Sequence, residues 1–374
     1  VKVRNLTLSE ELKKVFLHNF HKNNHAKFVP FAGFSMPINY KNGILNEHLQ
    51  VRESAGLFDV SHMGQILIPV DEKNIISLSK FIPLDFDKIN FNRCYYSFLL
   101  NNNGGIIDDL IISKIQYQQK NFFYIVYNAS RKKNDEEIFI NHLNNYILLT
   151  NNSLIAVQGP NSEKIINFIT ESKNLFFMQT KTSNFLNKEI IISRTGYTGE
   201  DGFEISVPND VSNQFIEILL QNSLIKLCGL GARDSLRIEA GLSLYGNELN
   251  EKITPIEASL TWSLHKSRLN DESLNGSKIL TNQLNGEIKN LKVGLKSISR
   301  TMLRSNTKIY NIDKNQIGYI SSGTFSPILG SSIGIGYINK SEINNKIYIL
   351  IRNNWEELNI VSLPFIQNRY KRGG

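Results

Sequence analysis

The sequence is poor in cysteine and has no long apolar run. Only two of its 374 residues are cysteine, Cys94 and Cys228, and two thiols form neither a disulfide framework nor a four-thiolate zinc site. We therefore expect a reducing compartment. No stretch of about 18 apolar residues is present, and the first residues lack an apolar core followed by a small-residue cleavage site. The sequence thus predicts neither a membrane protein nor a secreted one.

Several catalytic signatures are absent as well. The sequence contains no P-loop, HExxH, CxxC or GxSxG motif. Residues 229–231 (GLG) lack the third glycine of a dinucleotide fingerprint, and the seven histidines show no metal-ligand spacing on one element. We therefore expect no metal site and no chemistry based on a P-loop or a serine nucleophile.

The positive charge is concentrated near the C-terminus. The chain has 42 Lys and Arg against 34 Asp and Glu, a net charge of +8. Residues 1–284 contain 29 of each sign, whereas residues 285–374 contain 13 basic and 5 acidic residues. A nucleic-acid-binding protein would account for such an excess, but these basic residues lie mostly singly among predicted strands, and no basic run is interleaved with aromatic residues. We therefore expect no nucleic acid partner.

Hydrophobic periodicity divides the chain into a mixed region and an all-β region. At roughly 100–200 residues per domain, the length predicts two or three domains. Up to about residue 284, strands alternate with helices without a regular βαβ rhythm, which predicts an α+β fold. Short strands between Gly, Asn, Asp and Ser clusters then predict a small all-β domain. The predicted helices are 44–55, 211–220, one that contains Asp135 and one capped by Asn161; the predicted strands are 65–70, 95–100, 106–114, 122–127, 154–157, a hairpin at 189–207, 308–310, 316–320, 333–338, 346–352 and 361–363.

Four polar segments are candidates for function. The first, residues 58–64 (FDVSHMG), contains a carboxylate, a hydroxyl and an imidazole in Asp59, Ser61 and His62. Two interpretations stay open for these side chains. Either the three side chains form a catalytic group, or they cap and bridge a helix-to-strand corner. The second is the commoner role of such residues.

The second segment, residues 104–112 (GGIIDDLII), places Asp108 and Asp109 next to each other in a β-branched strand. Because side chains alternate faces, one of the two must point where its apolar neighbours are partly buried. Burial would raise the pKa of that carboxyl group and make it a better proton acceptor near neutral pH. An exposed strand start after the Gly-Gly turn is the alternative.

The third and fourth segments are residues 194–205 (RTGYTGEDGFEI) and 231–242 (GARDSLRIEAGL). The glycines of the third segment allow the backbone to approach a flat ligand closely, and the Glu204 carboxylate suits an N–H and NH₂ edge. In the fourth segment, Arg233 and Arg237 lie one helical turn apart, which suits an anionic or carbonyl-bearing ligand. The alternatives are an ordinary hairpin tip and a solvated arginine face.

In this order, the segments resemble the aminomethyltransferase (T-protein) family of the glycine cleavage system. The resemblance covers essentially the whole chain and is most specific in GYTGEDG and GARD. Phe34 stands where tryptophan is common in the family, and Glu248 and Asn250 replace aspartates. Further matching segments are 31–37 (FAGFSMP), 244–248 (LYGNE), 255–258 (PIEA) and 322–327 (SGTFSP).

The resemblance implies roles for six residues. Asp109 matches the catalytic carboxylate of the family. The other five match positions that contact or enclose folate: Glu204, Arg233 and Tyr370 as contacts, and Tyr96 and Tyr197 as walls of the pterin pocket.

The resemblance also implies the architecture. We expect a three-domain α+β cloverleaf of mostly antiparallel sheets with flanking helices. Its parts would be a discontinuous folate-binding domain of residues 1–50 and 141–280, an inserted ferredoxin-like domain of residues 51–140, and a C-terminal β-barrel domain of residues 281–374.

The reaction implied is the transfer of a methylene carbon to tetrahydrofolate, the co-substrate, with release of ammonia. The donor is an aminomethyl group on a lipoylated carrier, the H-protein. The location implied is the bacterial cytoplasm, or the mitochondrial matrix in a eukaryote. The alternative is a tetrahydrofolate-dependent demethylase of a small sulfonium or amine in the same superfamily; the related iron–sulfur assembly factor is disfavoured because residues 196–202 contain no cysteine. A folate polyglutamate tail or an acidic carrier would be attracted by the basic residues of 285–374.

Overall fold

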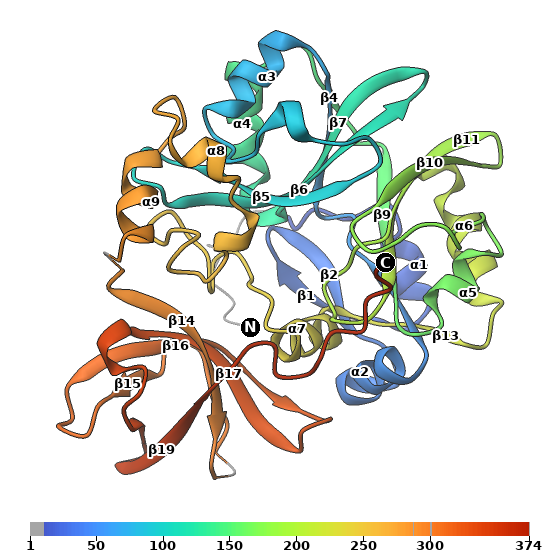
Figure 1. Ribbon diagram of the computed structural model, residues 1–374. Helices are drawn as coiled ribbons and strands as arrows, with labels where there is room; N and C mark the ends of the chain where they lie inside the picture. Colours follow the sequence, from blue (N-terminus) through green and yellow to red (C-terminus); the bar gives the residue numbers. More distant parts are fainter. Residues whose placement is uncertain (1–10, 287, 300, 374) are drawn as a thin grey trace.

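The computed structural model describes residues 11–286, 288–299 and 301–373. Its helices and strands form a mixed α+β fold with two open sheets, a closed barrel and a short hairpin (Figure 1). Apart from one parallel pair between β3 and β13, the neighbouring strands of all the sheets run antiparallel. The predicted fold class is thereby confirmed.

A six-stranded sheet forms the core of one part of the molecule. Helix α6 (Asn209–Leu220) covers it and buries Val211, Phe215 and Leu219, an apolar stripe of helical spacing. In spatial order the strands are β10 (Thr180–Phe185), β11 (Lys188–Ser193), β12 (Gly202–Pro208), β9 (Asn152–Gln158), β3 (Ala55–Asp59) and β13 (Ile225–Leu227).

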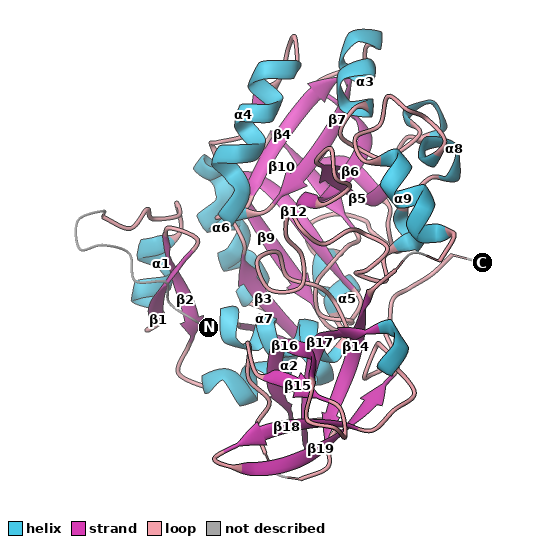
Figure 2. Ribbon diagram, turned by 90° about the vertical axis from the view of Figure 1, so that its left-hand side faces the viewer, coloured by secondary structure: helices cyan, strands magenta, loops and turns pink. Residues whose placement is uncertain are grey.

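A five-stranded sheet forms a second core. Helices α3 (Glu72–Ser79) and α4 (Lys132–His142) pack on it through Leu78 and Phe139 (Figure 2). The strands, in spatial order, are β5 (Cys94–Leu100), β6 (Ile106–Tyr117), β7 (Lys120–Tyr127), β4 (Gly64–Pro69) and β8 (Ile147–Leu148).

The C-terminal region is a closed six-stranded barrel. Its interior is filled by aliphatic side chains such as Leu295, Ile320 and Ile349. The prediction of a strand at 361–363 is wrong, because the last strand runs from Asn354 to Val361; its polar residues hid its period. The strands, in order around the barrel, are β14 (Asn290–Ser297), β17 (Ser331–Asn339), β16 (Gln316–Ser326), β15 (Lys308–Tyr310), β18 (Ile347–Ile351) and β19 (Asn354–Val361).

The remaining elements connect these parts. Helix α7 (Leu230–Glu239) contacts α2 on one side and the barrel strands β16 and β17 on another. Asn161 stands at the N-cap position of α5, as predicted, but its side chain caps no backbone amide and instead donates to Ser54 Oγ. The other elements are α1 (His18–Asn23), β1 (Lys27–Phe31), β2 (Phe34–Asn39), α2 (Gly43–Glu53), α5 (Ser162–Ile166), α8 (Lys266–Leu269) and α9 (Ser277–Leu284).

Strand pairing crosses the predicted domain boundaries at two places. Strand β3 lies in the sequence range of the inserted domain but pairs within the six-stranded sheet. Strand β8 lies outside that range but pairs within the five-stranded sheet. The division into domains at residues 50, 140 and 280 stays a prediction.

After β19 the chain leaves the barrel and returns to the six-stranded sheet (Figure 1). The backbone amide of Arg369 donates to Gly199 O at 2.8 Å, and that of Phe177 donates to Lys371 O at 2.8 Å. We call residues 365–373 the C-terminal segment. It joins the barrel to the glycine-rich loop before β12.

Candidate active site

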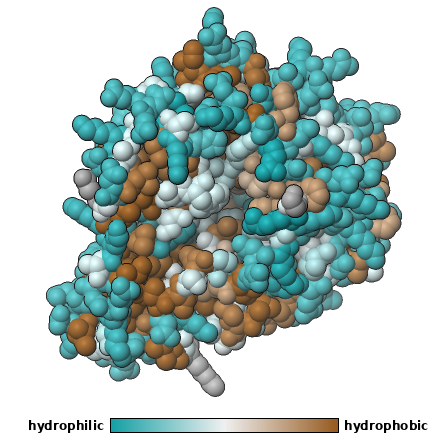
Figure 3. All heavy atoms as spheres, in the orientation of Figure 1, coloured by the Kyte–Doolittle hydropathy of each residue, from teal (hydrophilic) through white to brown (hydrophobic). Residues whose placement is uncertain are grey.

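Four of the six residues singled out in the sequence lie on the two open sheets and helix α7, and a fifth lies in a loop between two strands. Asp109 lies on β6 and Tyr96 on the neighbouring β5. Glu204 lies on β12, Arg233 on α7, and Tyr197 in the loop between β11 and β12. The face of the molecule seen in Figure 1 is hollowed near its centre, between the five-stranded sheet and the barrel (Figure 3).

The Asp109 carboxylate is held by two donors. Tyr96 donates its hydroxyl to Asp109 Oδ2 at 3.1 Å, and the Asn128 side chain donates Nδ2–H to Asp109 Oδ1 at 2.7 Å. The same Nδ2 group donates to Asp108 Oδ1 at 2.9 Å, and the Asn128 backbone amide donates to Asp108 Oδ2 at 2.8 Å. One asparagine therefore fixes both members of the carboxylate pair.

Burial makes this pair a proton-binding site. Burial, with the neighbouring charge of Asp108 second, raises the pKa of Asp109 to about 7. Burial likewise raises the pKa of Asp108, which is fully buried. The interpretation of both aspartates as an exposed strand start is wrong.

A third carboxyl group lies behind the pair. Asp135 on α4 is fully buried, and within the described residues neither of its carboxyl oxygens meets a hydrogen-bond donor of the surrounding protein. Burial and the adjacent Asp108 raise the pKa of Asp135. Because two buried carboxylates in contact cannot both ionise, Asp135 holds a proton beside Asp108.

Glu204 and Arg233 face each other without a close ion pair. Glu204 Oε1 lies 4.0 Å from Arg233 Nη2, and its other oxygen accepts a hydrogen bond from Thr195 Oγ1 at 2.7 Å. The guanidinium of Arg233 lies 4.8 Å from the centre of the Tyr197 ring. Within the described residues, Arg233 Nη1 is buried and has no hydrogen-bond partner. The Glu204 carboxylate, a hydrogen-bond acceptor, and the unused N–H donor of Arg233 Nη1 thus lie side by side.

The second arginine of α7 has a different environment. Arg237 is fully buried and donates to Glu248 Oε2 at 2.8 Å, to Asp234 Oδ1 at 2.9 Å and to Leu242 O at 3.1 Å. The protein itself thus supplies the acceptors for the Arg237 donors. Arg237 is therefore a structural residue, and of the two arginines only Arg233 has a donor to spare.

The two tyrosines face the same region as Asp109. The Asp109 charge raises the pKa of both Tyr96 and Tyr197, after burial, which is the larger cause. Tyr197 donates its hydroxyl to Ser243 O, so its ring is fixed by this bond and by Arg233. The structure therefore brings together Asp109, Tyr96, Tyr197, Arg233 and Glu204.

Tyr370 lies in the C-terminal segment, apart from the other five. Its ring is stacked on Phe177, with 3.9 Å between the ring centres and 2° between the planes. Within the described residues, no hydrogen bond, ion pair or ring contact joins it to Asp109, Glu204 or Arg233.

The glycines of the loop serve a purpose different from the one expected. A Cβ on Gly196 would lie 1.9 Å from Gln158 Oε1, and a Cβ on Gly202 would lie 2.4 Å from Gln158 Nε2. Gln158 also accepts from Thr198 Oγ1 at 2.9 Å and donates to Thr195 O at 3.0 Å. These two glycines make room for a protein side chain that holds the loop, rather than for a flat ligand.

The residues of segment 58–64 form a corner. Asp59 Oδ2 lies 2.7 Å from His21 Nε2, and its Oδ1 accepts from the Ser61 backbone amide at 2.8 Å. His62 is buried against the ring of Phe31, and burial lowers the pKa of His62 to about 3. These contacts support the capping interpretation.

Comparison with known proteins identifies the family of this chain. Residues 17–268 match the family model of the GCVT N-terminal domain, and residues 292–367 match that of the glycine cleavage T-protein C-terminal barrel domain. The chain belongs to the glycine cleavage T-protein family.

Relatives of this T-protein family chain span nearly its full length. It is 37% identical over 388 residues to the mitochondrial aminomethyltransferase of Dictyostelium discoideum, with 99% of this chain and 96% of that protein covered. It is 36% identical to the aminomethyltransferase of the bacterium Caldanaerobacter subterraneus, with coverages of 97% and 98%. The crystal structure of the glycine cleavage system aminomethyltransferase T from Bartonella henselae matches with a TM-score of 0.90 at 34% identity and covers 97% of this chain and 100% of that one.

Three residues of this T-protein site escaped the sequence analysis. Asn128 follows β7 and fixes the carboxylate pair, and Thr195 binds Glu204. Trp262 is stacked on Tyr96 with 5.7 Å between the ring centres and is 70% exposed. Thr195 lies within the candidate segment 194–205, but its role was not recognised there. No motif marks Asn128, which follows a strand, or Trp262, which lies in a short 3₁₀ helix (Thr261–Ser263).

The T-protein chain presents no metal centre in its described part. Among residues 11–286, 288–299 and 301–373, no group of three or more His, Cys, Asp or Glu side chains is arranged to hold a metal ion. In the same part of the chain, no helix has the length and apolarity needed to cross a membrane.

Proposed function

We propose that this chain is the aminomethyltransferase of glycine cleavage. It would transfer the methylene carbon of an aminomethyl group from the lipoylated H-protein to tetrahydrofolate, which yields 5,10-methylenetetrahydrofolate and releases ammonia. The observation that carries the proposal is the pairing of an acceptor, Glu204, with the unused buried donor of Arg233. The aminomethyltransferase names of the relatives support it.

The polar groups suit the pterin of tetrahydrofolate. A pterin presents an N–H and NH₂ edge beside carbonyl and ring-nitrogen acceptors, so one ligand can satisfy both residues. Glu204 Oε1 would accept from the N3–H and 2-amino edge. Arg233 Nη1 would donate to the acceptor edge or to a folate carboxylate, which removes the cost of a buried unpaired donor.

Aromatic side chains would enclose the ring. Tyr96 and Tyr197 are fixed by their own hydrogen bonds to Asp109 and Ser243, so they offer ring surface at little further entropic cost. Tyr370 would contact the folate from the C-terminal segment. We assign these three tyrosines to folate binding on the basis of the family resemblance and of these contacts.

Asp109 would handle the proton. Tetrahydrofolate supplies the nucleophilic nitrogen N5, so no serine or cysteine nucleophile is needed. With a pKa of about 7, Asp109 is partly ionised at neutral pH, and its carboxylate stabilises positive charge at N5 and accepts the proton that N5 loses. The protonated group then returns that proton to the amine, which leaves as ammonia when its carbon–nitrogen bond breaks. N10 attacks the same carbon to close the methylene bridge, the carbon–sulfur bond breaks, and the lipoyl sulfur takes up the proton lost by N10.

The basic C-terminal region would attract acidic partners. Residues 285–374 hold the whole excess of positive charge, and they include all six barrel strands and the C-terminal segment. Such a surface attracts either a folate polyglutamate tail or an acidic carrier. We propose the H-protein as the partner, with the chain divided into three domains around the site as expected from the sequence, and with a location in the bacterial cytoplasm or the mitochondrial matrix.

One assay tests the function. The protein is mixed with tetrahydrofolate and aminomethyl-loaded H-protein, and released ammonia and methylenetetrahydrofolate are measured. We expect ammonia release that requires both partners. Carrier-independent ammonia release, or consumption of a small methyl donor without ammonia, would instead support the demethylase.

The same assay at increasing salt tests the basic region. The KM for the loaded carrier should rise with ionic strength because exposed charges are screened. A KM that does not change with salt would contradict the electrostatic role.

A further inference from the structure

The C-terminal segment crosses the loop that carries Tyr197. Its backbone amides at Phe365 and Ile366 donate to Glu239 O at 3.0 and 3.2 Å, and that of Arg369 donates to Gly199 O at 2.8 Å. Gly199 has a positive φ of 79°, and a Cβ there would lie 2.9 Å from Asn368 Oδ1. The segment therefore lies directly against the glycine-rich loop.

Two carboxylates link the segment to the body of the protein: Glu163 accepts from Lys371 Nζ at 2.7 Å, and Glu200 binds Arg369. Glu200 Oε1 accepts from Arg369 Nη2 at 2.6 Å and from Arg52 Nη1 at 2.6 Å. Arg369 Nη2 also donates to Arg52 O at 2.7 Å. The side chain of Glu200 is 1% exposed, whereas that of Arg369 is 52% exposed. A buried anion thus receives a cation that reaches in from the surface.

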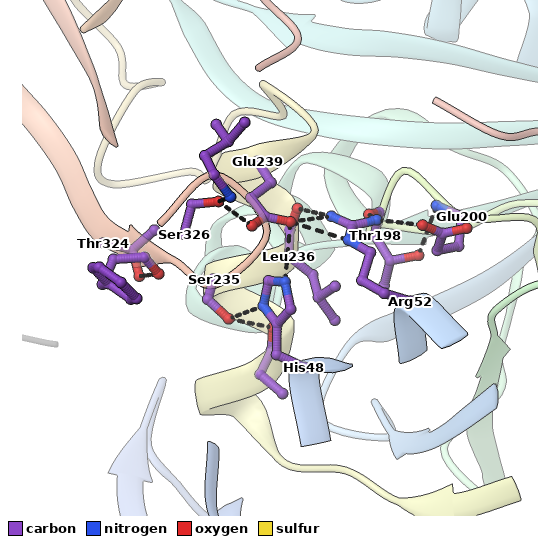
Figure 4. Close-up of polar contacts among 12 residues, drawn as sticks. His48, Arg52, Thr198, Glu200, Ser235, Leu236, Glu239, Thr324 and Ser326 are labelled. Carbon is purple, nitrogen blue, oxygen red and sulfur yellow. Dashed lines mark hydrogen bonds and ion pairs between the residues drawn. The ribbon is translucent and has the colours of Figure 1, made fainter. Parts of the chain in front are cut away.

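Arg52 is itself rigidly held. Its Nε and Nη2 donate to Glu239 Oε2 at 3.0 and 2.7 Å, and its Nη1 also donates to Thr198 O at 2.8 Å. Figure 4 shows Arg52 between the two carboxylates, with His48 and Ser326 on the far side of Glu239. Helix α2, helix α7, the barrel and the loop therefore meet at Arg52, which gives Glu200 a fixed position.

The next residue in the segment is Tyr370. One face of its ring is covered by Phe177, which is tied to the segment through its own amide and Lys371 O. The position of this tyrosine therefore depends on how firmly Arg369 is held, because a single peptide unit separates them.

We propose that Glu200 and Arg369 form a latch that holds the C-terminal segment on the loop and so positions Tyr370 for folate. Both are positioning residues, since neither is placed to touch the reacting atoms. The proposal rests on the proposed function in that Tyr370 is taken to contact folate. A latch of this kind acts on binding of the ligand in its ground state and transition state alike, so it affects KM rather than kcat.

Kinetics provide the first test. The Arg369→Met variant keeps the aliphatic stem and removes the charge, and we expect the KM for tetrahydrofolate to rise about fivefold to tenfold while kcat stays within about twofold. Arg369→Lys keeps the positive charge but lacks the guanidinium group. Its KM should therefore lie between those of the wild type and Arg369→Met. Lys188→Met, which breaks an exposed ion pair with Asp210 outside the basic region, is the matched control and should change neither constant.

Limited digestion with trypsin provides the second test, and it requires no activity. Cleavage after Lys371 is followed by intact mass. We expect the rate to increase about tenfold in Arg369→Met and in Glu200→Gln, because local opening exposes the segment. Arg369 is half-exposed, so its variants remain informative even if the Glu200 variant does not fold.

The outcomes separate the latch from the function. Unchanged cleavage in Arg369→Met would overturn the latch. Faster cleavage with an unchanged KM would overturn its role in placing Tyr370. If the wild-type protein transfers no aminomethyl carbon, the proposed function fails; digestion and the calorimetric affinity for tetrahydrofolate then decide the latch by themselves.

Discussion

Two buried clusters of carboxylates in this protein have opposite surroundings. Glu239 accepts hydrogen bonds from Arg52, His48 and Ser326, and these partners lower its pKa although burial alone would raise it. Asp109 and Asp108 share the uncharged Asn128, and burial raises the pKa of both. The same functional group is therefore ionised in one place and poised to exchange a proton in the other.

The difference teaches what separates a structural carboxylate from a reactive one. Burial penalises the charged form at both sites, and the outcome depends on whether cations compensate. At Glu239 the Arg52 guanidinium does so, together with hydrogen bonds from His48 and Ser326. At Asp109 the donors are neutral, and the charge of Asp108 adds to the penalty.

The largest expected effect comes from matched amide substitutions in the two clusters. Glu239→Gln leaves Arg52 and His48 buried beside a neutral group and should lower the free energy of unfolding by about 3–5 kcal/mol. Asp135→Asn replaces a protonated, neutral carboxyl group with a neutral amide of the same shape, so it should cost less than about 1 kcal/mol. Urea unfolding followed by circular dichroism compares them. Equal decreases in the free energy of unfolding would show that the two clusters of carboxylates do not differ in this way.

The next effect concerns turnover. Asp109→Asn keeps the hydrogen-bonding shape but cannot accept a proton, so kcat should fall about 100-fold or more. Tetrahydrofolate affinity, measured by calorimetry, should hardly change, because Glu204 and Arg233 remain. A variant that turns over at nearly the wild-type rate would exclude Asp109 from proton transfer.

The same variant should be more stable than the wild type at alkaline pH. Since the folded pKa of Asp109 is raised to about 7, the stabilising protonated form is fully present below the unfolded pKa of about 4 and is lost as the pH rises through 7. Asp109→Asn should therefore gain about 1–3 kcal/mol at pH 8, less than the full shift because Asp109 is half-buried. At pH 4 the two proteins should unfold at the same urea concentration. If Asp109→Asn were still more stable than the wild type at pH 4, ionisation of the Asp109 carboxyl group would not be the cause of the added stability.

The smallest expected effect is the pH dependence of the wild-type enzyme. If ionised Asp109 is the proton acceptor, kcat/KM should rise about tenfold between pH 6 and pH 8, with an apparent pKa near 7. Asp108→Asn removes the neighbouring charge and should move the apparent pKa to lower pH. A flat profile between pH 6 and pH 8 would place the essential ionisation elsewhere.

Much of the fold was predictable because its signals are local. The apolar stripe of α6 and the strand signals of β15 and β18 identified these elements within two residues at each end. The last barrel strand was missed at 354–360 because Asn354, Glu356 and Glu357 weaken its alternation, and only its pairing with β14 and β18 makes it a strand.

The candidate site was predictable in part. The adjacent aspartates in an apolar strand were anomalous enough to indicate a buried acid. The role of Asn128 was not predictable, because an asparagine after a strand is common and its two partners lie 19 and 20 residues away. The local pattern alone did not distinguish Arg233 from Arg237. The family resemblance favoured Arg233, and among the described residues the hydrogen-bond partners separate the residue with a free donor from the structural one.

By itself the sequence determined the family, because the order and spacing of the motifs can be recognised without coordinates. It also determined the class of each strongly periodic helix and strand, since periodicity is a property of neighbouring residues. Only the tertiary structure decided which charges are paired. Glu200 meets Arg369 across 169 residues of sequence, and Gln158, not a ligand, fills the space left by Gly196 and Gly202. Whether a side chain is ionised and how it is held depend on its desolvation and on the partners that folding brings to it. A local sequence pattern specifies neither of these.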